Sequence, residues 1–471
     1  MEIVVRDMHT RYERRLFYAL LGLLIFLPIP LGSDRPWAWG IVEFWTFTLT
    51  AFWVLGSLTD QCRINDVFRS AKPVLVLLGA WLAYTGLMLV PLPVALVELL
   101  SPKTAQLYQA TEFLVGERDW IPLSLYAHGS AVAWLKSLAY ILIFCLLLLL
   151  VNSRHRLYQL MGVLVYCGLA QAVYGGLTSM ASMNQFATGT FVNRNHLAGY
   201  LEITLAIGIG LLIAQLGGRE AHEWRQFVRN ILQLMLSPKM RLRVYLAIMV
   251  IALVLTHSRM GNSAFFTSLM ITGVIGLILS RHAVRSMVIL FVSLIVIDIF
   301  IVGTWFGIER VAERIQQTTA ESEVARTSVD SYAIEIWRDY PVFGSGAGTF
   351  EYMLPMYEQG DLNIFYDHVH NDYLEIALEN GTLGFVLLAA SVLWTVVIAL
   401  RAQYCRHDPL MRGASFAAIM GIISIMIHST VDFNLHIPAN AAMFMVLMAL
   451  GWIAMYHRHN GHNHIHSSEQ Q

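Results

Sequence analysis

The chain has 471 residues, of which 56% are hydrophobic and only 13% are charged, and its mean hydropathy is +0.57. Soluble domains carry about 25% charged residues, so this composition excludes an ordinary soluble protein and indicates an integral membrane protein. The formal net charge is −1 and there is no basic arm, so nothing favours nucleic acid as a partner. No Cys-x-x-Cys pair or secreted-type framework is formed by Cys62, Cys145, Cys167 and Cys405, so neither disulfides nor a zinc–thiolate site are predicted.

About twelve mostly apolar stretches follow one another along the chain, which predicts an all-α polytopic membrane protein. The charged start, Met1 to Arg15, leads into a first apolar run that continues into further spans, so no cleaved signal peptide is predicted. The predicted spans lie near 16–32, 38–57, 73–95, 131–151, 157–179, 196–217, 244–257, 260–280, 286–306, 382–402, 413–433 and 438–456.

Lysine and arginine gather in every second connection between these spans, which places those connections and both termini in the cytoplasm. The outer side then receives the long polar segment 307–381. It also receives the connections at 33–37, 96–130, 180–195, 258–259 and 434–437. We therefore divide the chain into a membrane domain over 1–306, an outer loop over 307–381, a second membrane domain over 382–456 and a His-rich cytoplasmic tail over 457–471.

Two further features belong to the predicted membrane part. The stretch 218–242 places Trp224, Phe227 and Ile231 at helical spacing among basic residues, which predicts an amphipathic helix on the inner leaflet. Asp298 lies within the predicted span 286–306. An acid inside a membrane marks either a functional site or a partner for a neighbouring helix, and both interpretations stay open.

Outer connections of membrane proteins normally avoid arginine, yet Arg35, Arg194 and Arg259 lie in them, and Lys136 lies near the outer end of its span. Asn195 is expected to cap the span that follows, and Arg194 beside that helix N-terminus makes a cationic, donor-rich spot. Arg259 lies in a tight turn between two spans, where it needs an anion. A lipid headgroup phosphate would serve as well as a substrate phosphate, so the residues alone do not decide between them.

The outer loop contains a predicted helix over 325–341. Its apolar residues recur at helical spacing and Pro341 ends the run. Arg326 and Arg338 lie on it, and Arg326 could simply pair with Asp330 four residues on. Alternating glycines then follow Phe343, which permits close backbone approach. No Lys-Ser/Thr pair follows them, so the segment is not a P-loop.

The stretch from Tyr366 to Phe385 has the pattern of a capped helix. His370 or Asn371 occupies the N-cap position, and Gly381 is expected to end the helix in the left-handed conformation. The positive end of the helix dipole favours a neutral imidazole at His370, which could accept a proton from a hydroxyl. The same helix end could hold a phosphate. An ordinary polar cap at the membrane edge is the alternative.

Histidines elsewhere in the outer segments raise two questions. His368 and His370 share one face of an extended strand, but no further ligand follows at a diagnostic spacing, so no metal site is predicted. The segment from His428 through Asp432 to His436 crosses between the last two spans. It either completes a cavity opposite His370 or caps two helices. The histidines of the tail 457–471 are expected to belong to a solvated segment.

These motifs together resemble those of a known family. His370-Asn371, nine residues, Gly381, two residues and Gly384 resemble the signature H-[N/S/Q]-x9-G-x-x-[G/T/Y] of the O-antigen ligase superfamily. That superfamily also includes O-antigen polymerases, exopolysaccharide polymerases and bacterial protein O-oligosaccharyltransferases. The stretch Phe191–Ala198 is similar to its Phe-x-Asn-x-Asn-x-x-Ala pattern, and the Ser258–Gly261 turn and the order of motifs in the outer loop resemble it as well.

The resemblance implies a GT-C-like fold in the bacterial inner membrane, with the active site facing the periplasm. It implies inverting, metal-independent transfer of a glycan from undecaprenyl diphosphate, without a cofactor. The acceptor would be lipid A-core for a ligase, a second lipid-linked repeat for a polymerase, or Ser or Thr for a protein transferase. A transporter and a structural assembly partner are the remaining alternatives; a transporter predicts an internal repeat, and none is evident.

The resemblance also implies roles for individual residues. The implied catalytic residues are His370, Arg259 and Arg326, and the implied contacts to the donor diphosphate are Arg194, Arg259, Arg326 and Asn371. Arg326 is chosen over Arg338 by order and spacing. Possible supporting residues are Lys136, Asn195, Arg338, His368, His428 and Asp432.

Overall fold

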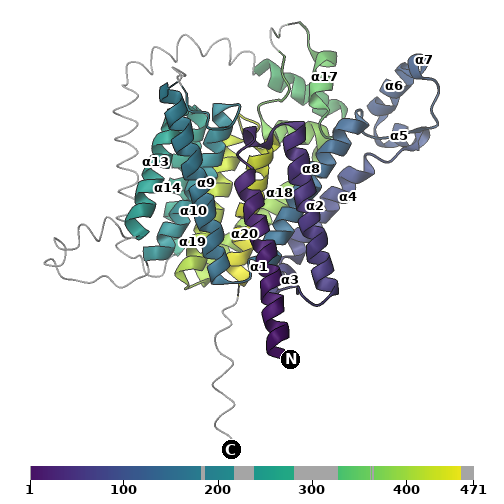
Figure 1. Ribbon diagram of the computed structural model, residues 1–471. Helices are drawn as coiled ribbons and strands as arrows, with labels where there is room; N and C mark the ends of the chain where they lie inside the picture. The colour runs from purple at the N-terminus through teal and green to yellow at the C-terminus, as the bar shows by residue number, and fades with distance from the viewer. Residues whose placement is uncertain are drawn as a thin grey trace, which may run out of the picture.

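The computed structural model describes residues 2–181, 186–216, 238–279, 327–360, 362 and 365–457. These residues form a bundle of long helices with a smaller, partly helical cap at one end (Figure 1). Within these described ranges, eight helices are long and apolar enough to cross a membrane, which supports the predicted all-α membrane class. They are α2 (Pro36–Leu58), α8 (Ala127–Leu150), α9 (Arg154–Ala181), α10 (Arg194–Leu216), α14 (Arg259–Leu279), α18 (Asp372–Cys405), α19 (Pro409–His428) and α20 (Pro438–Tyr456).

Other predicted spans match helices that are shorter or more polar: α1 (Glu2–Phe26), α4 (Lys72–Leu87) and α13 (Pro238–Leu255). The predicted span 286–306, with Asp298, lies outside the described residues. So do most of the stretch 218–242, the loop part 307–326 and the tail after residue 457. The number of about twelve spans therefore stays a prediction.

Short elements connect these helices. After α4, the strands β1 (Leu92–Pro93) and β2 (Trp120–Ile121) pair antiparallel, and the small helices between them project from the side of the bundle (Figure 1). The short helices are η1 (Leu31–Ser33), α3 (Asp66–Ser70), α5 (Val94–Leu100), α6 (Pro102–Ala110), α7 (Glu112–Val115), α17 (Phe350–Tyr357) and η2 (Asn434–His436). A further helix covers 327–339.

Helices α10, α19 and α20 form the centre of the bundle. In the most apolar part of each of these helices, 94%, 78% and 89% of the residues are buried inside the protein. In the peripheral α2 the share is 22%. Close approach of α10 and α19 depends on small residues, because a Cβ on Gly210 would lie 2.3 Å from the carbonyl oxygen of Gly413. The first turn of α10 is fixed against α20, because the Asn440 side chain donates a 3.0 Å hydrogen bond to the carbonyl of His196.

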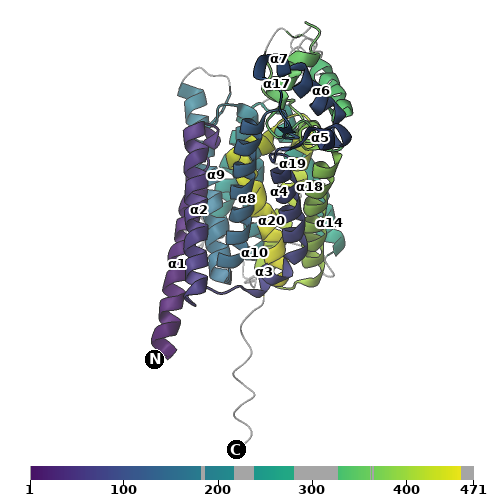
Figure 2. The ribbon, with the colours of Figure 1, turned by 90° about the vertical axis from the view of Figure 1, so that its right-hand side faces the viewer.

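Connections predicted to be cytoplasmic meet at the end of the bundle where α1 begins and α20 ends (Figure 2). Arg154 forms an ion pair with Asp408, which joins the α8–α9 connection to the α18–α19 connection. Asn152 donates a 2.9 Å hydrogen bond to Glu13 of α1. We call this end of the bundle the termini end, and the opposite end, which carries α17 and η2, the cap end. The assignment of the termini end to the cytoplasm remains a prediction.

The cap contains its own small apolar core. The predicted helix in the outer loop is present over 327–339, with Ala333 and Ile336 buried as expected and Pro341 beyond its end. It packs with α17 and with the segment that leads into α18, where Val369 is 1% exposed. The residue next to His370 is thus anchored in the cap core.

Helix α18 is broken at Gly381, as the sequence predicts, but the conformation differs from the expected left-handed cap. Gly381 has φ 63° and ψ 175°, a region that only glycine adopts readily, and the helix resumes directly after it. A Cβ at Gly381 would lie 2.1 Å from the carbonyl oxygen of Val342. The backbone of the segment around Val342 therefore packs directly against the break in α18. The expectation of a left-handed helix end was therefore wrong.

The glycine-rich segment satisfies the backbone groups that this break leaves free. Ser345 and Gly346 donate their N–H groups to the carbonyls of Leu378 and Glu379, each at 2.9 Å. Gly344 has φ 79°, and a Cβ there would lie 2.2 Å from the Glu379 carbonyl. The predicted close backbone approach is confirmed, and its partner is α18 rather than a ligand phosphate.

Candidate functional site

The beginning of α18 lies at the cap end and holds His370 in a fixed place. Asn371, not His370, is the N-cap, and its side chain accepts hydrogen bonds from the N–H groups of Tyr373 at 3.1 Å and Leu374 at 3.3 Å. His370 precedes the cap with φ 60°, an uncommon left-handed conformation for a residue other than glycine. The turn directs its ring toward the segment between α19 and α20.

Asp432 faces the His370 ring. Its Oδ1 atom lies 3.8 Å from His370 Nδ1, a nitrogen that has no hydrogen-bond partner within the part of the chain that the structure describes. The edge of the ring packs against Phe433 at 4.8 Å between centroids. The side chain of His370 is 21% exposed, so one side of the ring is enclosed and the other is accessible.

Asp432 is surrounded by histidines. His196 Nε2 lies 3.8 Å from its Oδ1 atom, and His428 Nε2 lies 3.6 Å from its Oδ2 atom. Burial alone raises the pKa of Asp432, but the neighbouring imidazoles of His370, His428 and His196 outweigh burial and hold the pKa well below its usual range. The surroundings of Asp432 therefore favour its ionised form.

A buried acid contacts the nitrogen of His428 that does not face Asp432. Glu202, in α10, accepts a 2.7 Å contact from His428 Nδ1 and a 2.7 Å hydrogen bond from the Ser424 hydroxyl. Both Glu202 and His428 are fully buried. A polar network thus runs from the middle of the bundle through His428 and Asp432 to His370.

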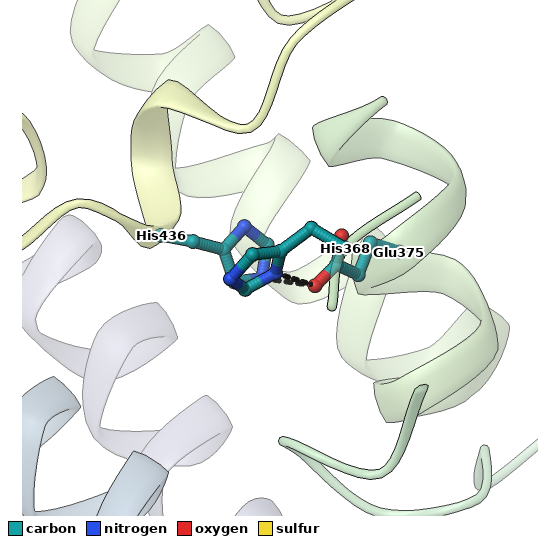
Figure 3. Close-up of side chains that lie close together, drawn as sticks. All are labelled: His368, Glu375 and His436. Carbon is teal, nitrogen blue, oxygen red and sulfur yellow. Dashed lines mark hydrogen bonds and ion pairs between the residues drawn. The ribbon is translucent and has the colours of Figure 1, made fainter. Parts of the chain in front are cut away.

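A second cluster of charged side chains, His368, Glu375 and His436, is drawn in Figure 3, and it adjoins the first because His368 stacks on Phe433 at 4.3 Å between ring centroids. His368 Nδ1 is 2.6 Å from Glu375 Oε1, and His436 Nε2 is 3.3 Å from the same oxygen. On its other side His436 Nδ1 lies 2.9 Å from Asp372 Oδ1. Burial lowers the pKa of His436, but the carboxylates of Glu375 and Asp372 outweigh it and raise the pKa to about 10. Burial likewise lowers the pKa of His368, and Glu375 more than compensates and raises it.

The predicted arginines of the outer connections lie at the same end of the bundle. Arg194 begins α10, and its guanidinium lies 4.0 Å above the ring of Phe186. The ring centroids of Phe186 and His257 are 5.4 Å apart. Arg259 follows His257 by two residues, begins α14 and is exposed. His196, two residues after Arg194, contacts Phe433 at 4.7 Å between ring centroids, so the first turn of α10 reaches the His370 site. Arg194 and Arg259 lie at the same end of the bundle as this site.

The loop arginines differ in what the structure says of them. Arg326 lies outside the described residues. Arg338 is exposed near the end of the helix over 327–339, and the adjacent Trp337 donates a hydrogen bond to Thr382 at 3.3 Å. Thr382 is ten residues after Asp372, which corresponds to about 15 Å along a helix. Arg338 is therefore placed toward the break in α18 rather than toward His370.

Two supporting residues have other roles than those expected. Asn193 rather than Asn195 caps α10, because its side chain accepts a 2.9 Å hydrogen bond from the Asn195 N–H. Lys136 of α8 lies 3.6 Å above the ring of Trp39 in α2. It interacts electrostatically with Asp34, whose pKa is raised by burial and lowered in part by Lys136 and His368, so Lys136 borders the second cluster.

The structure thus brings His370, Asn371, His368, His428 and Asp432 together, and it shows that the segment from His428 to His436 completes the site opposite His370. Several partners were missed in the sequence. Glu202 could have been found as an acid inside a predicted span, as Asp298 was. The acids on one buried face at the start of α18 carry the same signal. The residues missed are His196, Glu202, Asp372, Glu375, Phe433 and His436.

This arrangement combines an imidazole that faces a carboxylate with guanidinium groups at the same end of the bundle. A carboxylate beside an imidazole stabilises the imidazolium that forms when the ring accepts a proton. Guanidinium groups bind phosphate oxygens through their planar pair of N–H donors. Side chains of these kinds can therefore bind an anionic ester and remove a proton from a hydroxyl.

Comparison with known proteins finds a family model that matches part of the chain. Residues 244–389 match the family model Wzy_C, described as O-Antigen ligase. The matched stretch includes Arg259, the helix over 327–339, the glycine-rich segment and His370-Asn371, whereas Arg194 and Asp432 lie outside it. No curated protein matches the chain. The resemblance drawn from the motifs is confirmed over residues 244–389, which match the O-antigen ligase domain.

Proposed function

We propose that the protein transfers a glycan from a polyprenyl diphosphate to an acceptor hydroxyl at the cap end of the bundle. The observation that carries this proposal is the placement of His370 against Asp432 at the end of the bundle where Arg194 begins α10 and Arg259 begins α14. The family supports glycan transfer in general. The donor, the acceptor and the role of each residue are parts of the proposal.

In the proposed reaction the acceptor oxygen attacks the anomeric carbon of the donor sugar. The bond from that carbon to the diphosphate oxygen breaks, and the polyprenyl diphosphate leaves with the electron pair. His370 takes the acceptor proton at Nε2, and the Asp432 carboxylate, 3.8 Å from Nδ1, stabilises the imidazolium that forms. Since the attack is a single displacement, the configuration at the anomeric carbon is inverted.

The arginines stabilise the leaving group. A polyprenyl diphosphate gains negative charge as the bond breaks, and cations placed there lower the barrier. Arg259 is exposed and makes no hydrogen bond or ion pair with any residue that the structure describes, so its guanidinium is available to a ligand. Arg194 borders the same region through Phe186. Arg326 is proposed as the third cation, because Arg338 lies toward the break in α18.

The remaining parts of the proposal concern the lipid carrier, the membrane orientation and the acceptor. We infer undecaprenyl diphosphate as the lipid, with the cap end in the periplasm and the bundle in the inner membrane. The acceptor is lipid A-core in a ligase or a second lipid-linked repeat in a polymerase. Because the lipid tail of the donor stays in the bilayer, a site at the membrane edge can reach the diphosphate without extracting the lipid.

The test is an assay with purified protein in lipid nanodiscs and a synthetic undecaprenyl-diphosphate oligosaccharide. Lipid A-core, a second lipid-linked repeat and a serine-containing peptide are supplied in separate reactions. We expect release of undecaprenyl diphosphate and a new glycosidic bond with one of the first two acceptors. Absence of transfer to every acceptor, from protein that is folded and binds the donor, would overturn the proposal.

A further inference from the structure

Three side chains from three separate segments converge beside the His370 site (Figure 3). His368 comes from the segment before α18, Glu375 from the first turns of α18, and His436 from η2. Each offers one ligand atom, and these atoms all lie within 4.8 Å of one another. Convergence of two imidazole nitrogens and a carboxylate oxygen from distant parts of a chain is the geometry of a metal-binding site.

The next shell of contacts fixes which nitrogen of His436 faces the others. Its Nδ1 atom lies 2.9 Å from Asp372 Oδ1, so this nitrogen carries the proton and donates it to the carboxylate. Asp372 is held in turn by the Ser429 hydroxyl at 2.6 Å and the Leu435 N–H at 3.2 Å. The Nε2 lone pair of His436 is thereby directed at Glu375. A carboxylate that orients a histidine in this way is the usual support of a metal ligand.

Charge and access also fit a divalent cation. Without a metal, a proton on His436 pairs its Nε2 atom with Glu375 Oε1, 3.3 Å away, and a bound divalent ion would take the place of that proton. The side chain of Glu375 is 2% exposed, while those of His368 and His436 are 27% and 23% exposed, so the histidines leave an open side for entry and for water. One divalent ion bound to the two deprotonated imidazoles would balance the buried carboxylates of Glu375 and Asp372.

We propose that His368 Nδ1, Glu375 Oε1 and His436 Nε2 bind a Zn²⁺ ion, with water in the remaining position. Two nitrogens and one oxygen suit zinc better than magnesium or calcium, which prefer oxygen ligands. The site joins the segment that carries His370, two residues after His368, to α18 and to η2. Its role is to position that segment, and the ion takes no part in the bond changes proposed above.

The test compares full-length chains in which all five histidines of the tail are replaced by serine, so that the tail does not contribute imidazole ligands; they are His457, His459, His462, His464 and His466. The purified parent protein is stripped with chelator, dialysed against zinc and analysed for metal content. We expect about one zinc ion per chain. Glu375→Gln and His436→Asn should weaken zinc binding at least tenfold, and His155→Asn, which changes an exposed histidine at the termini end, should leave it unchanged.

A second measurement does not depend on a variant that must fold. Cobalt added to the stripped parent protein should give the intense visible absorption of a four-coordinate site, and zinc should displace it. Zinc should also raise the Tm of the parent protein. A parent protein that takes up no zinc and gives only the weak absorption of hydrated cobalt would overturn the proposal, as would equal zinc binding by the Glu375→Gln protein.

The outcome is separable from that of the proposed function. His370→Ala should keep its zinc while it loses glycan transfer, because His370 is not among the ligands. A protein that transfers glycan but binds no zinc would refute this site alone. A protein that binds zinc but transfers no glycan would refute the function alone.

Discussion

At the scale of single residues, the account depends on a pair that lies far apart in the chain. His370 alone has the pattern of an ordinary polar residue before a helix. Asp432 gives it a chemical function, because an ionised carboxylate 3.8 Å from Nδ1 orients the ring and compensates the charge that a proton brings. The sequence marks both residues but not their contact, since nothing local specifies which residue of the α19–α20 connection faces the ring.

Removing the charge of Asp432 should therefore reduce catalysis more than binding. We expect Asp432→Asn to lower kcat about a hundredfold or more while the KM for the donor changes little, because the ring loses its orientation and its counter-charge. Initial rates of polyprenyl diphosphate release measure this. Asp60→Asn, at an exposed turn after α2, is the control. A normal kcat in Asp432→Asn would rule out the positioning role.

Arg259 should act on the charged part of the donor. We expect Arg259→Ala to lower kcat/KM by roughly a hundredfold, because one charge-assisted contact to a diphosphate contributes about 2–4 kcal/mol in the transition state. Arg259→Lys should recover only part, since an ammonium group cannot bind two oxygens in the same plane. Arg401→Ala, an exposed arginine near the other end of α18, should have no effect. Equal rates for Arg259→Ala and Arg401→Ala would remove Arg259 from the site.

At the scale of elements, the two glycines of the family signature have a structural explanation. Gly381 lets α18 break where the glycine-rich segment crosses it, and Gly384 lets the helix approach α4, because a Cβ there would lie 3.0 Å from the Tyr84 ring. Tyr84 donates a 2.9 Å hydrogen bond to the freed carbonyl of Asn380. The signature thus holds the first turns of α18, and with them His370, at a fixed angle.

Replacing Gly381 should distort this element. Gly381→Ala puts a side chain into a backbone region that costs about 1–3 kcal/mol and against the Val342 carbonyl, so we expect a clear loss of thermal stability and of transfer activity. The control is Gly40→Ala in α2, where a Cβ meets nothing within 4 Å. That change should leave Tm unchanged or raise it. Thermal unfolding followed by tryptophan fluorescence in nanodiscs distinguishes the two; similar Tm values would contradict this explanation of the break.

Much of the element structure is predictable from the sequence, and its failures have physical causes. Apolar runs predict the long helices. Pro341 predicts where the helix over 327–339 ends, and Asn371 predicts where α18 begins. The cap of α10 was assigned two residues too late, because asparagines at 193 and 195 carry the same local signal. The contacts that build the site could not be predicted: His428 and Glu202 are 226 residues apart, and only the packing of α10 on α19 brings them together.

At the scale of the whole molecule, the residues of the candidate site and the basic connections lie at opposite ends of the bundle. The connections rich in lysine and arginine meet at the termini end, and the site residues meet at the cap end. Because a glycan on a lipid carrier extends into water while its tail stays in the bilayer, this separation suits a reaction at one membrane face. It does not suit transport, which requires binding groups near the middle of the bilayer.

The proposed orientation can be measured in intact cells. In a chain whose four cysteines are replaced, a single cysteine at Ser331 in the cap should react with a membrane-impermeant maleimide added outside, after the outer membrane is permeabilised. A cysteine at Arg401 should react only after cell lysis, since the basic connections are expected in the cytoplasm. The reverse labelling pattern would invert the topology and exclude a periplasmic site.

The most direct test of the central claim is the rate of glycan transfer by His370→Ala. The protein is purified in nanodiscs and supplied with the undecaprenyl-diphosphate oligosaccharide and the acceptor that the parent uses. We expect the transfer rate to fall at least a hundredfold, as typical for loss of a general base, with donor binding and Tm close to those of the parent. His155→Ala, an exposed histidine at the termini end, should transfer at the parental rate. Transfer by His370→Ala at the parental rate would show that this imidazole does not receive the acceptor proton.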